Sequence, residues 1–117
     1  VAAGADAAVP GVPVTDTVKV VQVVSADSPV PGARQVVDTP VRDSLVAVQT
    51  PQAFRAAVLR AAHERALTAR EEATDDAALV ERLGGVVVVV PGEADNRKLT
   101  QPDDIVWARQ RLLGATT

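Results

Sequence analysis

The stretch G-G-V-V-V-V-V-P-G, residues 84–92, decides the fold class of this chain. Its five consecutive valines are typical of a strand covered on both faces, as in a parallel or mixed sheet under helices, so we expect a central strand here. The glycine pair before the valines is suited to ending a helix, and the Pro-Gly pair after them to forming a turn. A helix, an apolar strand and a turn in this order predict an α/β protein.

Two further short strands are predicted upstream. Residues 7–14 are apolar but are interrupted by Pro10 and Pro13, which indicates a strand with an irregular exit. Residues 45–49 form a second short apolar run. Both runs are therefore expected to join the sheet.

A hairpin is predicted between these two strands. Residues 18–24 and 35–41 are rich in valine, and the segment between them, 25–34, is rich in turn-forming residues. Because a two-stranded ribbon is only marginally stable alone in water, an arm this apolar needs another surface to cover it. We expect the arm, residues 18–44, to protrude and to be covered by a second subunit.

A first helix is predicted from residue 51 to about residue 68. Thr50 places a hydroxyl at a cap position, and Pro51 follows where its missing N–H costs nothing. Its expected apolar stripe consists of Phe54, Val58, Ala61, Ala62 and Ala66.

Two more helices are predicted after it. Thr74 is the expected cap of the second helix, whose first turn holds Asp75 and Asp76, the charge sign that the helix dipole favours. Thr100 with Asp103 resembles a capping box at the start of a third helix, from about residue 101 to residue 113. The expected buried face of this third helix consists of Ile105, Ala108, Leu112 and Leu113.

Length and composition bound the class of protein. With 117 residues and 47% hydrophobic content, the chain is long enough for one modest core and too short for two. A net charge of −3 and a pI near 5.0 argue against a nucleic-acid partner, because phosphate-backbone binding relies on a basic face. The absence of cysteine excludes disulfides and Cys-based zinc sites, and no apolar run approaches the roughly 20 residues that span a bilayer. We therefore expect a soluble protein without a membrane partner, suited to a reducing cytoplasm.

Three polar stretches are the candidate functional segments. Residues 13–19, 48–54 and 94–100 each put hydroxyls or cations where an apolar strand meets a loop or a helix. This is the usual place for an α/β protein to hold a charged ligand. Together they predict an oxyanion site, and the physical chemistry alone stops at phosphate binding.

Thr17 and Arg42 are the candidate ligand residues at the ends of the arm. Thr17 and Lys19 could both address an anion, or Thr17 could simply organise a turn while Lys19 is solvated. The guanidinium of Arg42 offers a planar fork of donors suited to paired phosphate oxygens. Its alternative is a surface contact with Asp43, which would contribute little to stability.

Lys98 is the most informative single cation. It follows the valine strand at the carboxyl end, where open α/β sheets bind ligands, and it precedes a helix N-terminus that adds positive potential. The neighbouring Arg97 is expected to be solvated, with a salt bridge to Asp95 as the alternative.

These stretches, taken in order, resemble the C-terminal half of the 2-C-methyl-D-erythritol 4-phosphate cytidylyltransferase family. The matching patterns are P-V-x-D-T-x-K at 13–19, T-P-Q at 50–52 and A-D-N-x-K-x-T at 94–100, and the resemblance extends from about residue 7 to residue 113. It implies the C-terminal part of a Rossmann-like nucleotidyltransferase sheet, with flanking helices and a β-hairpin dimerisation arm. It also implies transfer of CMP from CTP to 2-C-methyl-D-erythritol 4-phosphate, with release of pyrophosphate.

The resemblance assigns roles to four residues. Arg42 and Lys98 would position the methylerythritol phosphate for catalysis, and Thr17 and Thr50 would add hydrogen bonds to this substrate. Since Arg42 and Thr17 lie on the arm, they would act in the neighbouring subunit's site of a homodimer. The catalytic and substrate-binding expectations therefore rest on one set of cations and hydroxyls.

The resemblance also implies what these residues do not supply. The family's P-A-A-G-x-G-x-R loop, its nucleotide pocket and its metal-binding Asp have no counterpart in the sequence. We therefore expect residues 1–117 to be a single partial domain, the C-terminal half of an enzyme whose N-terminal half binds CTP and Mg²⁺. Two alternatives stay open: a cytidylyltransferase for another polyol phosphate such as ribitol 5-phosphate, and a non-catalytic dimerisation module.

Overall fold

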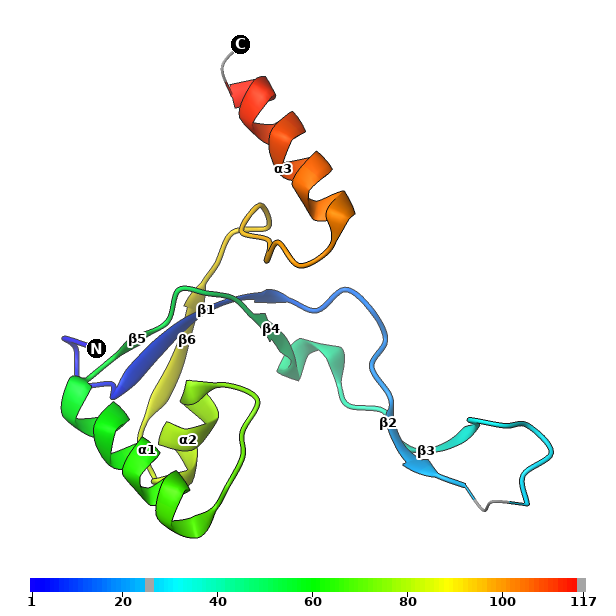
Figure 1. Cartoon of the computed structure of the whole chain (residues 1–117), viewed down its shortest axis with the longest axis horizontal. Helices are drawn as coiled ribbons and strands as arrows, with labels where there is room; N and C mark the ends of the chain where they lie inside the picture. Colours follow the sequence, from blue (N-terminus) through cyan, green and yellow to red (C-terminus); the bar gives the residue numbers. More distant parts are fainter. Residues whose placement is uncertain (25–26, 116–117) are drawn as a thin grey trace. The chain divides into compact units, whose positions relative to one another are not determined.

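The computed structural model describes residues 1–24 and 27–115, and it divides into two compact units (Figure 1). The sheet unit comprises Val1–Val12 and Val48–Thr117, and the arm unit comprises Pro13–Ala47.

The sheet unit is built around strand β1 (Ala7–Pro13). Strand β6 (Val87–Pro91) runs parallel to it, with Ala7 opposite Val87 and Gly11 opposite Pro91. Strand β5 (Ala53–Phe54) pairs antiparallel with the start of β1, and β4 (Val46–Val48), whose last residue belongs to the sheet unit, also pairs with β1. The predicted mixed sheet and both predicted upstream strands are therefore confirmed.

The valine run forms a strand, but the prediction that this strand is central is wrong for the part of the chain described. Its hydrogen-bonded neighbour there is β1 alone, and Val88, Val89 and Val90 remain 38, 48 and 42% exposed. The central position belongs to β1, whose Ala7 and Val9 are buried. A run of valines reports that both faces of a strand are apolar, but it does not specify which strand lies at each edge.

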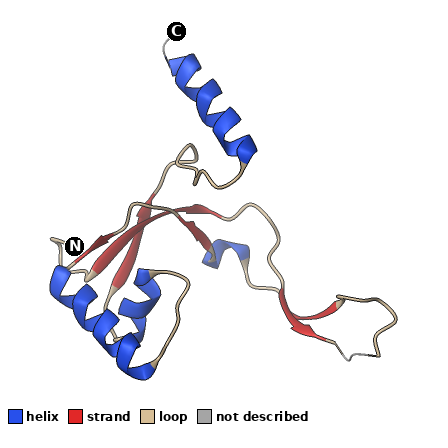
Figure 2. Ribbon diagram, viewed as in Figure 1, coloured by secondary structure: helices blue, strands red, loops and turns tan. Residues whose placement is uncertain are grey.

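Helices α1 (Ala56–Ala69) and α2 (Asp76–Arg82) lie together on one face of the sheet (Figure 2). Their contact forms the hydrophobic core, which includes residues of the predicted stripe of α1. A hydrogen bond of 2.9 Å between His63 Nε2 and Asp76 Oδ1 also links the two helices. The buried core residues are Ala62, Ala66, Leu79 and Val80, with Phe54, Val58, Leu59, Ala73 and Val87 packed against them.

The predicted start of the first helix is wrong. Thr50 is not its cap: the Thr50–Pro51 peptide bond is cis, and α1 begins only at Ala56, after Arg55. Between them, Ala53 and Phe54 pair with β1 as strand β5. Pairing with the sheet and packing of Phe54 against the core thus outweigh the local helix-start signal.

The second helix begins and ends near its predicted boundaries, with a different cap. Asp75, and not Thr74, caps α2, because its Oδ1 accepts a 2.9 Å hydrogen bond from the backbone N–H of Ala78. Gly84 follows the helix with φ +86°, a left-handed conformation in which glycine avoids the cost of a Cβ atom. The predicted glycine stop is confirmed.

Helix α3 (Pro102–Ala115) confirms the third predicted helix but corrects two of its details. Asp104, and not Asp103, accepts the backbone N–H groups of Thr100 and Gln101, at 3.1 and 2.9 Å. The expected buried face is wrong, since Ile105, Leu112 and Leu113 are 51, 69 and 69% exposed. Periodicity identifies an apolar face, but it does not supply the surface that would cover that face. Across the described residues, the helices are too short or too polar to cross a membrane.

The arm unit contains the predicted hairpin. Strand β2 (Val20–Val23) pairs antiparallel with β3 (Arg34–Asp38), and the short 3₁₀ helix η1 (Arg42–Ser44) follows. All residues of both strands are exposed. Ser25 and Ala26, which belong to the expected tip, lie outside the described residues.

Candidate functional site

Thr50 and Lys98 line the same pocket of the sheet unit, which has a volume of about 240 Å³. A space of this volume can hold more than one water molecule and therefore suits a small ligand. Six of its seven lining residues carry polar side chains. The lining residues are Val48, Gln49, Thr50, Gln52, Asp75, Asn96 and Lys98.

The pocket lies where two strands of the sheet end. Because β1 and β6 are parallel, their carboxyl ends meet at the same edge, where the backbone N–H of Gly92 donates to the carbonyl of Gly11 at 2.9 Å. The loop that contains Lys98 leaves β6 at this edge. Open α/β sheets bind ligands at such positions.

Two side-chain amides hold the walls of the pocket together. The Nε2 of Gln49 donates to the backbone carbonyls of Glu93, at 2.7 Å, and of Asn96, at 3.1 Å. In the opposite direction, the Nδ2 of Asn96 donates to the carbonyl of Thr50 at 2.6 Å. The segment that contains Thr50 and the loop that contains Lys98 are therefore linked by bonds from both sides.

The pocket presents both signs of charge. Lys98 contributes an ammonium group, and Asp75 contributes a carboxylate. The Oδ1 of Asp75 accepts the N–H of Ala78, while its Oδ2 accepts a long hydrogen bond of 3.5 Å from the Nε2 of Gln52. A cation and a hydroxyl suit phosphate oxygens, whereas a carboxylate and amides suit the hydroxyl groups of a polyol.

Arg97, the other cation of this loop, points to helix α3. Its Nη2 lies 3.0 Å from Asp104 Oδ1, and its guanidinium lies over the ring of Trp107. Arg97 remains exposed as expected, with 46% of its side chain accessible, but it is held by these two contacts and is not surrounded by solvent alone. Its alternative partner Asp95 pairs instead with Arg111. The stack on an aromatic ring and the charge pair together explain why Arg97 is held while Lys98 is left at the pocket.

Arg42 and Thr17, the other two predicted ligand residues, belong to the arm unit. The Nη1 of Arg42 donates to the backbone carbonyl of Thr15 at 2.8 Å. The ion pairs among the described residues do not include the alternative contact of Arg42 with Asp43. Both Arg42 and Thr17 are exposed. Lys19 donates to the hydroxyl of Thr39 at 2.9 Å and is therefore held across the base of the hairpin.

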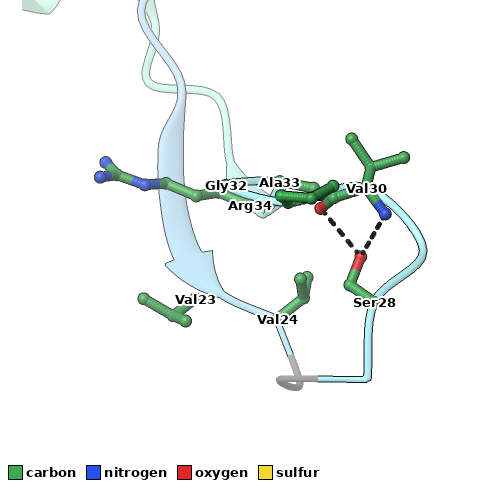
Figure 3. Close-up of a pocket in the computed structure, with 8 residues that line it drawn as sticks. Val23, Val24, Ser28, Val30, Gly32, Ala33 and Arg34 are labelled. Carbon is green, nitrogen blue, oxygen red and sulfur yellow. Dashed lines mark hydrogen bonds between the residues drawn. The ribbon is translucent and has the colours of Figure 1, made fainter.

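A second hollow, of about 310 Å³, lies at the tip of the arm unit (Figure 3). Three of its eight lining residues are valines. The hydroxyl of Ser28 donates to the carbonyl of Val30 and accepts its N–H, at 3.3 and 3.4 Å. In Figure 3 the side chain of Arg34 extends away from Ser28. The hydroxyl of Ser28 is therefore bonded within the turn, and the residues that line this hollow do not form a cluster of ligand-binding groups.

The described residues do not fit a metal site. Among them, no group of three or more His, Cys, Asp or Glu side chains could hold a metal ion.

Sequence reasoning did not assign the residues that surround Thr50 and Lys98. Gln49 and Asn96 lie within two of the polar stretches, and Asp75 was interpreted only through the helix dipole. The available signal was an amide within two residues of each predicted ligand residue, since an amide at a strand end can bind backbone groups of a neighbouring loop. Only the fold shows that each of these amides bonds to the backbone of the other's segment.

Comparison with known proteins gives one consistent result. The family model described as IspD, 2-C-methyl-D-erythritol 4-phosphate cytidylyltransferase, matches residues 1–113. A 2-C-methyl-D-erythritol 4-phosphate cytidylyltransferase of Rubrobacter xylanophilus is 50% identical over 109 residues, which cover 93% of this chain and 43% of the relative. The enzyme of the same name from Streptomyces coelicolor is 50% identical over 110 residues, covering 93% of this chain and 38% of the relative.

Solved structures agree with this result. The crystal structure of 2-C-methyl-D-erythritol 4-phosphate cytidylyltransferase from Thermus thermophilus is 41% identical, with a TM-score of 0.71 over 92% of this chain and 48% of that one. The 4-diphosphocytidyl-2C-methyl-D-erythritol synthase of Anaerococcus prevotii is 33% identical, with a TM-score of 0.74 over 93% of this chain and 45% of that one. The chain thus spans less than half the length of these relatives.

Proposed function

This chain belongs to the IspD family of 2-C-methyl-D-erythritol 4-phosphate cytidylyltransferases, and we propose on that basis that it forms the polyol-phosphate side of such an enzyme's active site. The reaction would transfer CMP from CTP to 2-C-methyl-D-erythritol 4-phosphate and release pyrophosphate. An oxygen of the polyol phosphate attacks the α-phosphorus of CTP, and the bond from that phosphorus to the pyrophosphate oxygen breaks.

One observation supports this proposal most directly. Thr50 and Lys98 come from two distant segments of the sequence, and both line one small pocket at the carboxyl ends of parallel strands. A hydroxyl donor and an ammonium group in one pocket suit the oxygens of a phosphate monoester. The amide of Gln52 and the carboxylate of Asp75, which line the same pocket, suit the hydroxyl groups of its polyol chain.

The residues of the pocket would act by positioning and by charge neutralisation. Two phosphate groups repel each other, so transfer requires that the attacking oxygen be held in line while negative charge is compensated. Lys98 would supply that charge, and Thr50 would orient the phosphate by a hydrogen bond. No protein nucleophile is needed for this chemistry.

The arm residues complete the proposed site. A guanidinium has five N–H donors, so the bond from Arg42 to the Thr15 carbonyl leaves donors for a phosphate. We assign Arg42 and Thr17 to the polyol phosphate of the neighbouring subunit in a homodimer. The exposed valines of β2 and β3 support a covering partner for the arm, because exposed apolar surface of this kind favours association.

The remaining parts of the proposal concern the rest of the enzyme. We assign the binding of CTP and of a divalent metal ion, magnesium, to a further part of the enzyme, because the matched region covers less than half of the relatives' length. The setting we propose is the cytoplasm, where nucleoside triphosphates are available.

Steady-state assays of the complete enzyme test the proposal. Pyrophosphate release is measured with CTP and either 2-C-methyl-D-erythritol 4-phosphate or ribitol 5-phosphate. We expect a strong preference for the first, and a fall in kcat/KM of at least about tenfold for Lys98→Met, the effect of a lost charge-assisted hydrogen bond. Arg60→Met, which removes an exposed cation of α1, is the matched control and should change little.

Two results would contradict the proposal. A strong preference for ribitol 5-phosphate would identify the enzyme as a cytidylyltransferase for another polyol phosphate. No transfer to either substrate would favour a non-catalytic dimerisation module.

A further inference from the structure

We propose that Gln49 and Asn96 are positioning residues, whose amides fix the distance between Thr50 and Lys98 and so set the geometry in which the polyol phosphate is held. This inference rests on the proposed function and deepens it. In this role the amides of Gln49 and Asn96 bond to the protein backbone and do not need to contact the substrate.

Gln49 attaches the Lys98 loop to the sheet through three hydrogen bonds. Its Nε2 donates to the carbonyls of Glu93 and Asn96, at 2.7 and 3.1 Å, and its Oε1 accepts the N–H of Glu93 at 3.3 Å. The backbone of Gln49 is itself held by the sheet, because its N–H donates to the carbonyl of Pro10 at 2.8 Å. The loop is therefore tied to the edge of β1 through one side chain.

Asn96 makes the reciprocal attachment. Its Nδ2 donates to the carbonyl of Thr50 at 2.6 Å, and its own backbone N–H closes a turn onto the carbonyl of Glu93 at 3.0 Å. Thr50 follows Gln49 directly, and Lys98 lies two residues after Asn96. The amide of Asn96 thus holds the backbone of Thr50 itself, and the amide of Gln49 holds the backbone two residues before Lys98.

Gly92 supports the inference independently, because its lack of a side chain leaves room for the side chain of Gln49. A Cβ atom at Gly92 would collide with the Oε1 of Gln49 and would lie 3.2 Å from its Cδ. The missing side chain therefore allows the amide to reach the loop backbone. Any larger residue at position 92 would have to displace Gln49.

The flexibility of the Lys98 side chain explains why hydrogen bonds that fix the nearby backbone would matter. Lys98 is a long side chain on a loop without regular secondary structure, so its reach alone does not define where its ammonium group lies. In-line transfer is sensitive to displacements of about 1 Å in the reacting groups. Bonds that hold the backbone beside Thr50 and Lys98 restrict such displacements.

The test uses uncharged replacements in the complete enzyme. Gln49→Met keeps the length of the side chain but removes its hydrogen bonds, and Asn96→Ala removes the bond to Thr50. For each we expect the KM for 2-C-methyl-D-erythritol 4-phosphate to rise about tenfold, the combined effect of lost hydrogen bonds, with the KM for CTP within about twofold of wild type. Gly92→Ala should produce the same pattern without changing either amide.

Gln110→Met is the matched control, since it makes the same replacement at an exposed position of α3. It should leave both KM values unchanged. The coupling to Lys98 is measured with the double variant Gln49→Met, Lys98→Met. If Gln49 acts through Lys98, its effect on KM should shrink to about twofold or less once Lys98 is gone.

Three outcomes would overturn the inference. The first is an unchanged KM for the polyol phosphate in both Gln49→Met and Asn96→Ala. The second is an equal rise in both KM values, which indicates a general structural role, and the third is full additivity with Lys98→Met. These outcomes differ from failure of the proposed function, in which the wild-type enzyme itself shows no transfer to methylerythritol phosphate.

If Gln49→Met does not fold, the inference is tested in the wild-type enzyme by hydrogen exchange of the Gln49 side-chain amide, measured by nuclear magnetic resonance. The Nε2 protons of Gln49 should exchange with water at least about tenfold more slowly than those of an exposed glutamine amide, because two carbonyls hold them. Exchange at the rate of an exposed amide would show that Gln49 does not maintain these hydrogen bonds, and would overturn the inference.

Discussion

The guanidinium of Arg97 lies over the indole of Trp107, 4.5 Å from the ring centroid, and pairs at the same time with Asp104 at 3.0 Å. Cation–π contacts and charge-assisted hydrogen bonds both favour a planar guanidinium. They join the end of the Lys98 loop to the first turns of α3. The two adjacent cations therefore have separate partners, with Arg97 bound to the helix and Lys98 lining the pocket.

The pH dependence of this junction follows from Asp104. Hydrogen bonds from the backbone N–H groups of Thr100 and Gln101 lower the pKa of Asp104 below its ordinary value of 3.8, and the charge of Arg97 acts in the same direction. A carboxyl whose pKa is lowered on folding stabilises the fold above its unfolded value, and that contribution is lost as the pH falls through the folded pKa. We expect the free energy of unfolding to decrease below about pH 4 through this group.

Urea denaturation at a series of pH values between about 2 and 6 measures this effect, with Asp104→Asn as the comparison. The variant should be less stable near the upper end of this range and should lose less stability on acidification than the wild type does. Asp103→Asn, one position earlier and exposed, is the control and should retain the wild-type slope. Parallel wild-type and Asp104→Asn curves would contradict the assignment.

The fold was largely predictable, because hydrophobic patterns specify elements. The valine run, the hairpin and the glycine stop at Gly84 all appear near their predicted positions. The helix start at Thr50 was not predictable from local signals, since the competing partner of Ala53 and Phe54 is β1, far away in the sequence. Local propensity does not include such long-range pairing.

The candidate site was predictable only in its cation and its hydroxyl. The place of Lys98 at a strand end and the family resemblance of Thr50 predict these two residues, and the fold brings them into one pocket. The positioning role of Gln49 and Asn96 was not predictable, because the sequence of an amide residue is the same whether its side chain is solvated or bonded to a neighbouring loop. The difference depends on backbone carbonyls that only the folded chain places within hydrogen-bond distance.

The core between α1 and α2 predicts a large difference between two leucines. Leu79 is 9% exposed and belongs to the core, whereas Leu67 on α1 is 80% exposed. Leu79→Ala should therefore lower the free energy of unfolding by about 3 kcal/mol through lost burial and a residual cavity. Leu67→Ala should change it by less than about 0.5 kcal/mol. Urea denaturation of both variants provides the comparison, and equal effects would contradict the placement of the core.

Two glycines are expected to respond to alanine with opposite signs. Gly84 has φ +86° at the end of α2, so Gly84→Ala should destabilise by about 1 kcal/mol even though its Cβ would meet no atom within 4 Å. Gly114 lies within α3, also with open space around a Cβ, and Gly114→Ala should stabilise the helix by about 0.5–1 kcal/mol. Thermal melting of the two variants measures both signs. A stabilising Gly84→Ala would contradict the left-handed turn after α2.

Arg42→Lys tests the proposed contribution of the arm to the active site. Lysine keeps the positive charge but loses the planar pair of donors, so a bidentate contact with phosphate cannot be reproduced. In the complete enzyme we expect the KM for 2-C-methyl-D-erythritol 4-phosphate to rise about tenfold and kcat to fall, with the KM for CTP nearly unchanged. Arg34→Lys, an equivalent replacement on strand β3, is the matched control. Because Arg42 also bonds to the Thr15 carbonyl, melting temperatures of both variants are needed to separate folding from binding. Wild-type kinetics in Arg42→Lys would remove this residue from the polyol-phosphate site and leave Thr50 and Lys98 as its proposed ligands.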